Sequence, residues 1–155
     1  MTDAIEHLMD TAGATQILSH LLCCDVEFVK NLGSRVDIAS YAQKLASNAT
    51  KFEAWSGGSL VGLLAAYFND SRKNAAFITN VSVVTGWTHQ GVAASLVRKA
   101  VEHAKVLGLK HISLEVARAN SSAVKLYTNS GFAVHGVGGT FMDMTLYLER
   151  RALDE

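Results

Sequence analysis

Residues 85–97 read TGWTHQGVAASLV and decide the fold, because they join two segments whose apolar residues repeat with different periods. The residues before them, AAFITNVSVV (75–84), are rich in β-branched side chains and predict a strand. The residues after them place apolar side chains every three or four positions, which predicts a helix with one buried stripe. Gly91, Ala93 and Ala94 begin this helix with little or no side chain, so the N–H groups of its first turn lie open to a partner.

The start of this helix is a candidate anion site. Unpaired N–H groups and aligned peptide dipoles give a helix N-terminus about half a positive charge, which suits a phosphate. The same small residues also suit close packing of the helix against a strand, so the stretch alone leaves both interpretations open. The glycines do not form GxGxxG and no GK[ST] follows, which excludes the dinucleotide and Walker fingerprints.

The remaining chain predicts an α+β fold with a mixed sheet, and we expect residues 1–155 to form a single domain. Gly57 and Gly58 separate two apolar runs and predict a hairpin, and Gly138 and Gly139 predict a second one. The predicted helices are 14–22, a helix following Asp37 as its N-cap, and 120–130, and the predicted strands are 51–56, 59–68, 111–116, 132–137 and 140–148.

Composition excludes several classes of protein. The chain has 155 residues, and Lys plus Arg equal Asp plus Glu at 14 each, so no basic field attracts nucleic acid. No apolar run reaches the roughly 18 residues of a membrane span. Cys23 and Cys24 are neighbours, which rarely form a disulfide, so we expect a reducing, cytoplasmic setting. The histidines show no HExxH spacing, and we expect no metal.

Two motifs carry a resemblance to a known family. The pattern Q/R-x-x-G-x-G/A falls on residues 88–93, THQGVA, although Thr88 stands where Arg or Gln is usual. A pattern of Asn, a short helix, Leu-Tyr, three residues and Gly-Phe falls on residues 120–132. With these motifs at this spacing, residues 76–135 resemble the GNAT superfamily of acetyl-CoA-dependent N-acetyltransferases.

The resemblance implies a mixed, mostly antiparallel central sheet of about six or seven strands flanked by about four helices. It also implies acetyl-CoA as co-substrate, with the motif backbone around the phosphates and the preceding strand beside pantetheine where the sheet splays apart. A free strand amide there would polarise the thioester carbonyl, as an oxyanion hole does. The implied coenzyme-binding residues are Val81, Ser82, Val83, Thr88, His89, Gln90, Gly91, Val92, Ala93, Ala94 and Asn120.

Tyr127 is the catalytic residue that the resemblance implies. In family members such a tyrosine lies beside the coenzyme sulfur and protonates the departing thiolate, a role that suits a phenol with a pKa near 10. The alternative interpretation is a core aromatic residue that only packs under the sheet. Asn120 likewise has a plain role, because an asparagine at this position is a good helix N-cap.

The amine-side base stays unassigned. Many family members place a Glu on the strand before the coenzyme motif, but ITNVSVV (78–84) offers Asn80 and Ser82, and neither is a useful base. The remaining candidates all have an ordinary surface role as the alternative: they are Glu53, Asp70, Glu115, His111 and His135.

The acceptor would contact the first two helices and the early strands, because such segments usually carry specificity. The candidate acceptor residues are Phe28, Arg35, Tyr41, Trp55, Tyr67, Asn69 and Asn80. The expected reaction is acetyl transfer to a primary amine of a small molecule, amino sugar or peptide by direct attack. Thr88 and the missing base leave open a catalytically inactive acyl-CoA-binding or protein-interaction module. Homodimerisation through the late strands is plausible because a sheet edge is exposed there.

Overall fold

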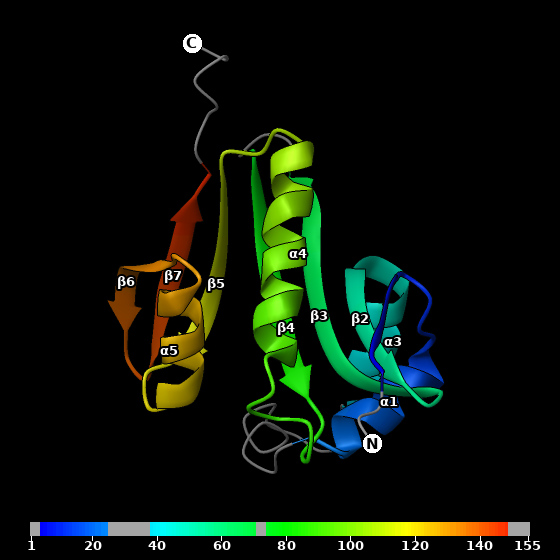
Figure 1. Ribbon diagram of the computed structural model, residues 1–155. Coiled ribbons are helices and arrows are strands. Elements are labelled where there is room, and N and C mark those ends of the chain that lie inside the picture. The colour runs from blue at the N-terminus through cyan, green and yellow to red at the C-terminus, as the bar shows by residue number, and fades with distance from the viewer. Residues whose placement is uncertain (1–3, 25–37, 71–73, 149–155) are drawn as a thin grey trace.

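The computed structural model describes residues 4–24, 38–70 and 74–148, with Asn69 and Asp70 described by their backbone. Figure 1 shows one continuous sheet with α4 and α5 in front of it. The elements in chain order are β1 (Glu6–Met9), α1 (Ala14–Leu22), α3 (Ile38–Asn48), β2 (Thr50–Ser56), β3 (Ser59–Asp70), β4 (Ala75–Val83), α4 (Val92–Val106), β5 (His111–Ala117), α5 (Ser121–Asn129), β6 (Ala133–Gly138) and β7 (Phe141–Tyr147).

The sheet has seven strands in the order β1-β2-β3-β4-β5-β7-β6, and β4 with β5 is its parallel pair. All other neighbouring strands are antiparallel, as expected for the predicted α+β fold. The parallel ladder is short: it begins at Ala75 opposite His111 and ends at Ile78 opposite Leu114. Beyond Ile78, β4 pairs with β3 but not with β5, so the sheet opens between these two strands.

Alternate residues of β3 belong to two separate cores. Leu64 and Ala66 pack in a cluster with α4 and with Tyr127 of α5, whereas Leu63 and Ala65 pack in a cluster with α1 and α3. Because successive side chains of a strand point to opposite faces, α4 and α5 cover one face and α1 and α3 the other. We call these the α4 face and the α1 face.

The predicted helix α4, both predicted hairpins and the predicted helix α1 are confirmed. The stripe of α4 is buried at Leu96, Val97, Ala100 and Ala104, and Gly108 ends the helix with a φ of 76°. Both predicted hairpins are present, although β3 extends through Asp70, two residues beyond the predicted strand. The predicted helix at 14–22 has the observed bounds of α1.

β1 corrects the sequence analysis, which placed helices first. Its four residues, EHLM, are all exposed and pair at the sheet edge with β2. They have no alternating burial and no β-branched residue, so nothing local indicates a strand. The conformation of β1 therefore depends on its backbone hydrogen bonds with the partner strand β2.

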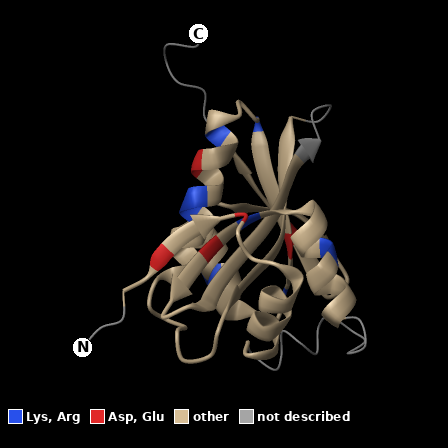
Figure 2. Cartoon of the chain, turned by 90° about the vertical axis from the view of Figure 1, so that its right-hand side faces the viewer, with Lys and Arg blue, Asp and Glu red and all other residues tan. Residues whose placement is uncertain are grey.

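Charges are spread over the molecule rather than gathered by sign. Figure 2 shows Lys, Arg, Asp and Glu interspersed along the ribbon, and on α4 Lys105 lies 3.7 Å from Glu102. Within residues 4–24, 38–70 and 74–148, no helix has the length and apolar content needed to cross a bilayer.

Candidate functional site

The N-terminus of α4 lies open to solvent. Thr88, His89, Gln90 and Gly91 are exposed, and Gly91 is the N-cap with a φ of 82° in the left-handed region. Because Gly91 has no side chain that could cap the helix, N–H groups of the first turn are available to an anion. The Val92 side chain is buried, which leaves its backbone as the group that faces a ligand.

Two glycines separate the packing and binding interpretations of this turn. A Cβ added at Gly91 would meet no atom within 4 Å, so close packing does not explain this glycine. At Gly62 of β3, a Cβ would lie 2.6 Å from Val92 Cγ1 and 3.2 Å from Leu96 Cδ1. Gly62 is therefore the residue that lets α4 approach the sheet, whereas Gly91 supplies an unusual φ in open space.

A groove of about 360 Å³ runs between α4 and α5. Ala94, Val97, Arg98 and Val101 form its α4 side, and Leu126, Asn129 and Ser130 form its α5 side. Arg98 is exposed on the first half of α4, so the groove combines an apolar floor with a positive charge. The sequence analysis did not identify Arg98, because a surface arginine on a helix is uninformative until the facing helix is known.

The opened strand edge lies beside this helix start. Val81, Ser82 and Val83 pair with β3 on one side and have no β5 partner on the other. Val81 and Val83 pack toward the α4 face, while Ser82 hydrogen-bonds to residues on the α1 face. Consequently, β4 offers backbone groups to the gap and side chains to both faces.

α5 carries the second motif. Asn120 accepts a hydrogen bond from Ala123 N at 3.2 Å, so its N-cap role is present. Tyr127 is buried and stacks edge-on against Phe132 with ring centroids 6.0 Å apart. Burial raises the pKa of Tyr127 well above its ordinary value, so the hydroxyl keeps its proton throughout the working range of pH.

A chain of polar side chains crosses the α1 face behind β4. His20 of α1 places Nδ1 2.8 Å from the Leu60 carbonyl and Nε2 2.9 Å from Ser82 Oγ. Ser82 Oγ lies 2.8 Å from Asn80 Oδ1, and Asn80 Nδ2 lies 3.4 Å from the Tyr41 hydroxyl. His20, Ser82 and Asn80 are buried and Tyr41 is half-buried, so the chain leads from the protein interior toward its surface.

Tyr41 also marks an irregularity in β4. Ala65 pairs with Asn80 and Ala66 with Ile78, which leaves Thr79 as an extra residue in β4. The Tyr41 hydroxyl donates to the Thr79 carbonyl at 3.3 Å, so a side chain satisfies the backbone group at this bulge. The bulge begins where the β4–β5 ladder ends.

Glu53 is a structural carboxylate and not the solvated strand residue that we considered. It is fully buried and accepts hydrogen bonds from Thr11 N, Thr11 Oγ, Ala12 N and Trp55 Nε1. These bonds tie the β1–α1 loop to the sheet. Four donors occupy its oxygens, so Glu53 is not a candidate base.

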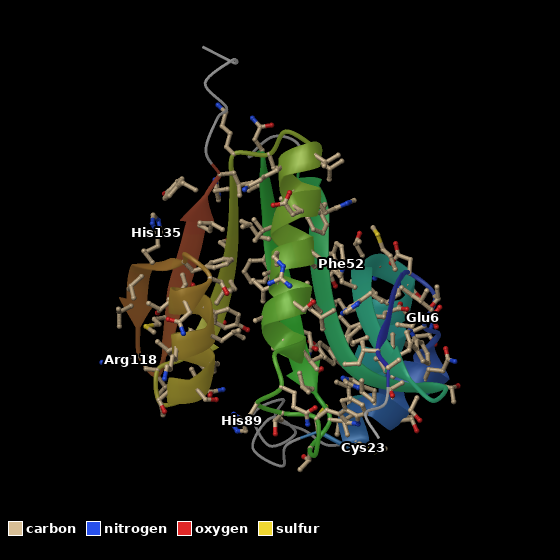
Figure 3. The ribbon with its side chains drawn as sticks, in the orientation of Figure 1. Glu6, Cys23, Phe52, His89, Arg118 and His135 are labelled. Carbon is tan, nitrogen blue, oxygen red and sulfur yellow. The ribbon has the colours of Figure 1, made fainter. Side chains whose placement is uncertain are left out.

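The other candidate bases are dispersed. His111 lies at the closed end of the β4–β5 ladder, and His135 is on the edge strand β6, on the far side of the sheet from β1, as Figure 3 shows. Glu115 is exposed on β5, directly opposite Asp143 of β7. The Asp70 side chain lies outside the described residues.

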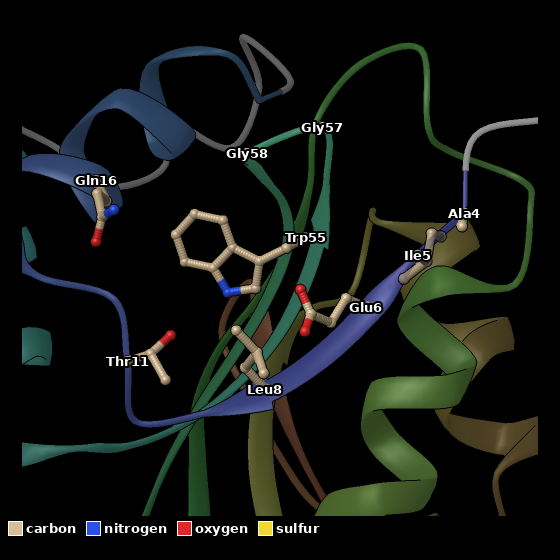
Figure 4. A pocket seen from close by; sticks show the side chains of 9 residues that line it. All are labelled: Ala4, Ile5, Glu6, Leu8, Thr11, Gln16, Trp55, Gly57 and Gly58. Carbon is tan, nitrogen blue, oxygen red and sulfur yellow. The ribbon is translucent and has the colours of Figure 1, made fainter.

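The candidate acceptor residues divide into three groups. Tyr41 and Asn80 lie together in the polar chain, and Tyr67 packs beside the α1-face core. Trp55 instead lines a separate hollow of about 540 Å³ near the tip of the β2–β3 hairpin, where Figure 4 shows it beside Glu6. Phe28 and Arg35, and the side chain of Asn69, lie outside the described residues.

Comparisons with known proteins point to one family. Residues 5–132 match the acetyltransferase (GNAT) family. The GCN5-related N-acetyltransferase 6, chloroplastic, of Arabidopsis thaliana is 34% identical over 62 residues, which are 40% of this chain and 22% of that protein. The match therefore spans about a fifth of that relative's length.

Solved structures share the fold at low identity. A PaiA N-acetyltransferase from Thermoplasma acidophilum, in complex with coenzyme A, has a TM-score of 0.74 at 17% identity over 93% of this chain and 99% of that one. A putative acetyltransferase of the GNAT family from Desulfovibrio desulfuricans has a TM-score of 0.78 at 12% identity over 94% and 100%. The ribosomal-protein-S18-alanine N-acetyltransferase from Escherichia coli has a TM-score of 0.74 at 16% identity over 97% of both chains.

Proposed function

Because this chain belongs to the acetyltransferase (GNAT) family, we propose that it transfers an acetyl group from acetyl-CoA to a primary amine by direct attack. The observation that carries this proposal is the coincidence of the open β4 edge with the exposed N-terminus of α4. The first offers unpaired backbone groups to a pantetheine arm and a thioester. The second offers N–H groups and a positive dipole to a pyrophosphate.

The coenzyme in this proposal lies along α4. Residues 88–94 would hold the pyrophosphate through backbone N–H groups, so Thr88 in place of Arg or Gln removes little of the binding energy. Arg98 in the groove between α4 and α5 would pair with a coenzyme phosphate. Asn120 would contact the coenzyme while it caps α5.

Tyr127 would donate its proton to the departing CoA thiolate. Its location among apolar residues on the α4 face keeps the hydroxyl protonated and would exclude water from the coenzyme sulfur. As the C–S bond breaks, negative charge grows on sulfur, and a positioned hydroxyl stabilises that charge more than it stabilises the bound thioester.

The acceptor amine would approach from the α1 face. Glu115 and Asp143 are direct cross-strand neighbours on the far side of the gap, and their carboxylates would attract a protonated amine. Tyr41 and Asn80 supply polar contacts on the near side. This arrangement suits a small molecule, an amino sugar or a peptide N-terminus.

Calorimetric titration with acetyl-CoA, compared with CoA that lacks the 3′-phosphate, tests the coenzyme site. We expect micromolar binding of acetyl-CoA, which is about 8 kcal/mol. A panel of primary amines is then screened for release of the CoA thiol. Binding without thiol release from any amine would favour the inactive acyl-CoA-binding module, and an absence of binding at millimolar acetyl-CoA would reject the proposal.

A further inference from the structure

The hydrogen bonds of His20 fix which nitrogen carries its proton. Nδ1 faces the Leu60 carbonyl at 2.8 Å, and a carbonyl accepts but never donates, so Nδ1 is protonated. In the neutral ring, Nε2 then carries a lone pair directed at Ser82 Oγ, 2.9 Å away. Cys24 also lies near Nε2, at 3.6 Å, but its thiol donates to the His20 carbonyl at 3.3 Å. Ser82 is therefore the donor best placed to face Nε2.

The polar chain has two complete hydrogen-bond patterns that differ by one proton on His20. With His20 protonated, each donor points outward: His20 Nε2 to Ser82, Ser82 to Asn80 Oδ1, Asn80 Nδ2 to Tyr41, and Tyr41 to the Thr79 carbonyl. With His20 neutral, the Asn80 amide turns over, and every bond from Tyr41 to His20 reverses. In the second pattern the Tyr41 proton turns from the Thr79 carbonyl to Asn80, so the four side chains keep their partners and the chain accommodates a proton arriving at His20.

We propose that Ser82 and His20 together form the base that removes the proton from the attacking amine, with Ser82 Oγ contacting the amine. This inference rests on the proposed function, because it needs the thioester in the gap between β4 and β5. Ser82 lies on the part of β4 that has no β5 partner, and its hydroxyl is on the α1 face, from which the acceptor would approach in the proposed function. His20 acts through Ser82 and is the final holder of the proton.

The proton transfers balance. As the amine nitrogen bonds to the carbonyl carbon, its N–H bond breaks and an O–H bond forms on Ser82. The original Ser82 O–H bond breaks in the same step, and an N–H bond forms at His20 Nε2. The C–S bond then breaks, and Tyr127 protonates the thiolate. Exchange with solvent afterwards removes the proton from His20 and restores the one on Tyr127.

The surroundings of His20 support a neutral ring that can accept a proton. Burial lowers the pKa of His20 below the ordinary histidine value, while backbone hydrogen bonds with Leu60 and Ser82 act in the opposite direction. The ring is consequently uncharged at neutral pH.

Other titratable groups on this face are engaged or distant. Lys51 forms an ion pair with Asp10 and donates hydrogen bonds to two backbone carbonyls at the end of α3. Glu53 accepts the four hydrogen bonds described above. Tyr41 of α3 is the far end of the chain, and burial raises its pKa. Glu115 and Asp143 lie across the gap. Among the described residues, Cys24 is the ionisable side chain nearest the ring.

The test compares three single variants, and the double variant of Ser82 and His20, with the wild-type enzyme, using the amine identified in the thiol-release screen. Ser82→Ala removes the hydroxyl, and His20→Asn keeps a donor for Leu60 but accepts no proton. Ser56→Ala, a buried serine of β2, is the matched control. For each protein we measure the acetyl-CoA Kd by calorimetry and kcat/KM for the amine as a function of pH.

The proposal expects Ser82→Ala and His20→Asn each to lower kcat/KM by about 100-fold or more, with acetyl-CoA Kd unchanged. The loss of activity below pH 6.5 that belongs to His20 disappears in both variants, whereas ionisation of the free amine is common to all proteins. The double variant is no slower than either single variant, because the two side chains work as one unit.

Different results separate the two levels of inference. If both single variants keep kcat/KM within about threefold and retain the acid limb, the base lies elsewhere and acetyl transfer itself stands. If wild-type protein binds acetyl-CoA but acetylates no amine, the relay and the proposed function fail together. Ser82→Ala removes a single oxygen atom, so this variant alone tests whether Ser82 and His20 form the base, even if His20→Asn does not fold.

Discussion

The two faces of the sheet differ in how they are held together. The α4 face is an apolar cluster in which Tyr127 is the buried side chain with an ionisable group. The α1 face buries His20, Lys51, Glu53, Asn80 and Ser82, each with hydrogen-bond partners. Apolar packing tolerates small changes of shape, whereas a buried polar network requires every partner. We conclude that the α4 face suits a single hydroxyl that keeps its proton until the thiolate forms, whereas the α1 face suits transfer of a proton along hydrogen bonds.

Tyr127→Phe tests the α4 face and has the largest expected effect. The phenyl ring preserves the contact with Phe132, so the fold and the acetyl-CoA Kd should be unchanged. Loss of the hydroxyl should lower kcat by about 100-fold to 1000-fold, because the thiolate loses its proton donor. Tyr147→Phe, at an exposed tyrosine of β7, is the control. An unchanged kcat would show that Tyr127 only packs.

Glu53→Gln tests the α1 face through stability. The amide nitrogen of Gln cannot accept the bonds now made by Thr11, Ala12 and Trp55, so buried donors lose their charged acceptor. We expect the free energy of unfolding to decrease by about 2–3 kcal/mol in urea denaturation. Glu115→Gln removes a charge from an exposed site of β5 and should change stability by less than about 0.5 kcal/mol. Equal effects of the two changes would contradict the structural role.

Arg98→Gln tests the groove between α4 and α5. We expect acetyl-CoA binding to weaken about tenfold, or about 1.4 kcal/mol, because one ion pair with a phosphate is lost. Lys99→Gln, one residue further along α4 and also exposed, is the control. The same titration with CoA lacking the 3′-phosphate identifies the phosphate: if Arg98 contacts it, the substitution leaves that weaker binding unchanged.

The smallest expected effect is a pH dependence of stability. Burial lowers the pKa of folded His20, so below pH 6.5 the unfolded chain binds more protons than the folded chain. The free energy of unfolding should therefore fall as the pH decreases below that value. His20→Asn should remove this part of the dependence, whereas His135→Asn on exposed β6 should not. Urea midpoints measured on both sides of pH 6.5 provide the check.

Local patterns predicted most of the fold because each rests on neighbouring residues. The strand and the helix within residues 75–107 have clear periods, and Asn120 is the N-cap of α5. β1 was missed because four exposed residues take their conformation from β2. The packing role of Gly62 was missed because the helix that approaches it begins 30 residues further along the chain.

The site was predicted less completely for the same reason. The coenzyme motifs lie within short segments, whereas the polar chain joins α1, α3 and β4. His20 and Ser82 are 62 residues apart, and a histidine among the leucines of a helix gives no sign of a partner. Asn80 and Ser82 are not bases in isolation. The contact with His20 changes what Ser82 can do.

The short ladder between β4 and β5 has a consequence for how the molecule opens. Residues 111–147 form a contiguous segment of three strands and one helix, and four residue pairs join its first strand to β4. Such a segment can separate as one cooperative unit, and its amides should exchange with deuterium together and sooner than those of β2 and β3. A ligand that spans the gap between β4 and β5 would slow this exchange throughout the segment, so amides of β6, at the outer edge of the sheet, would report occupancy of the gap.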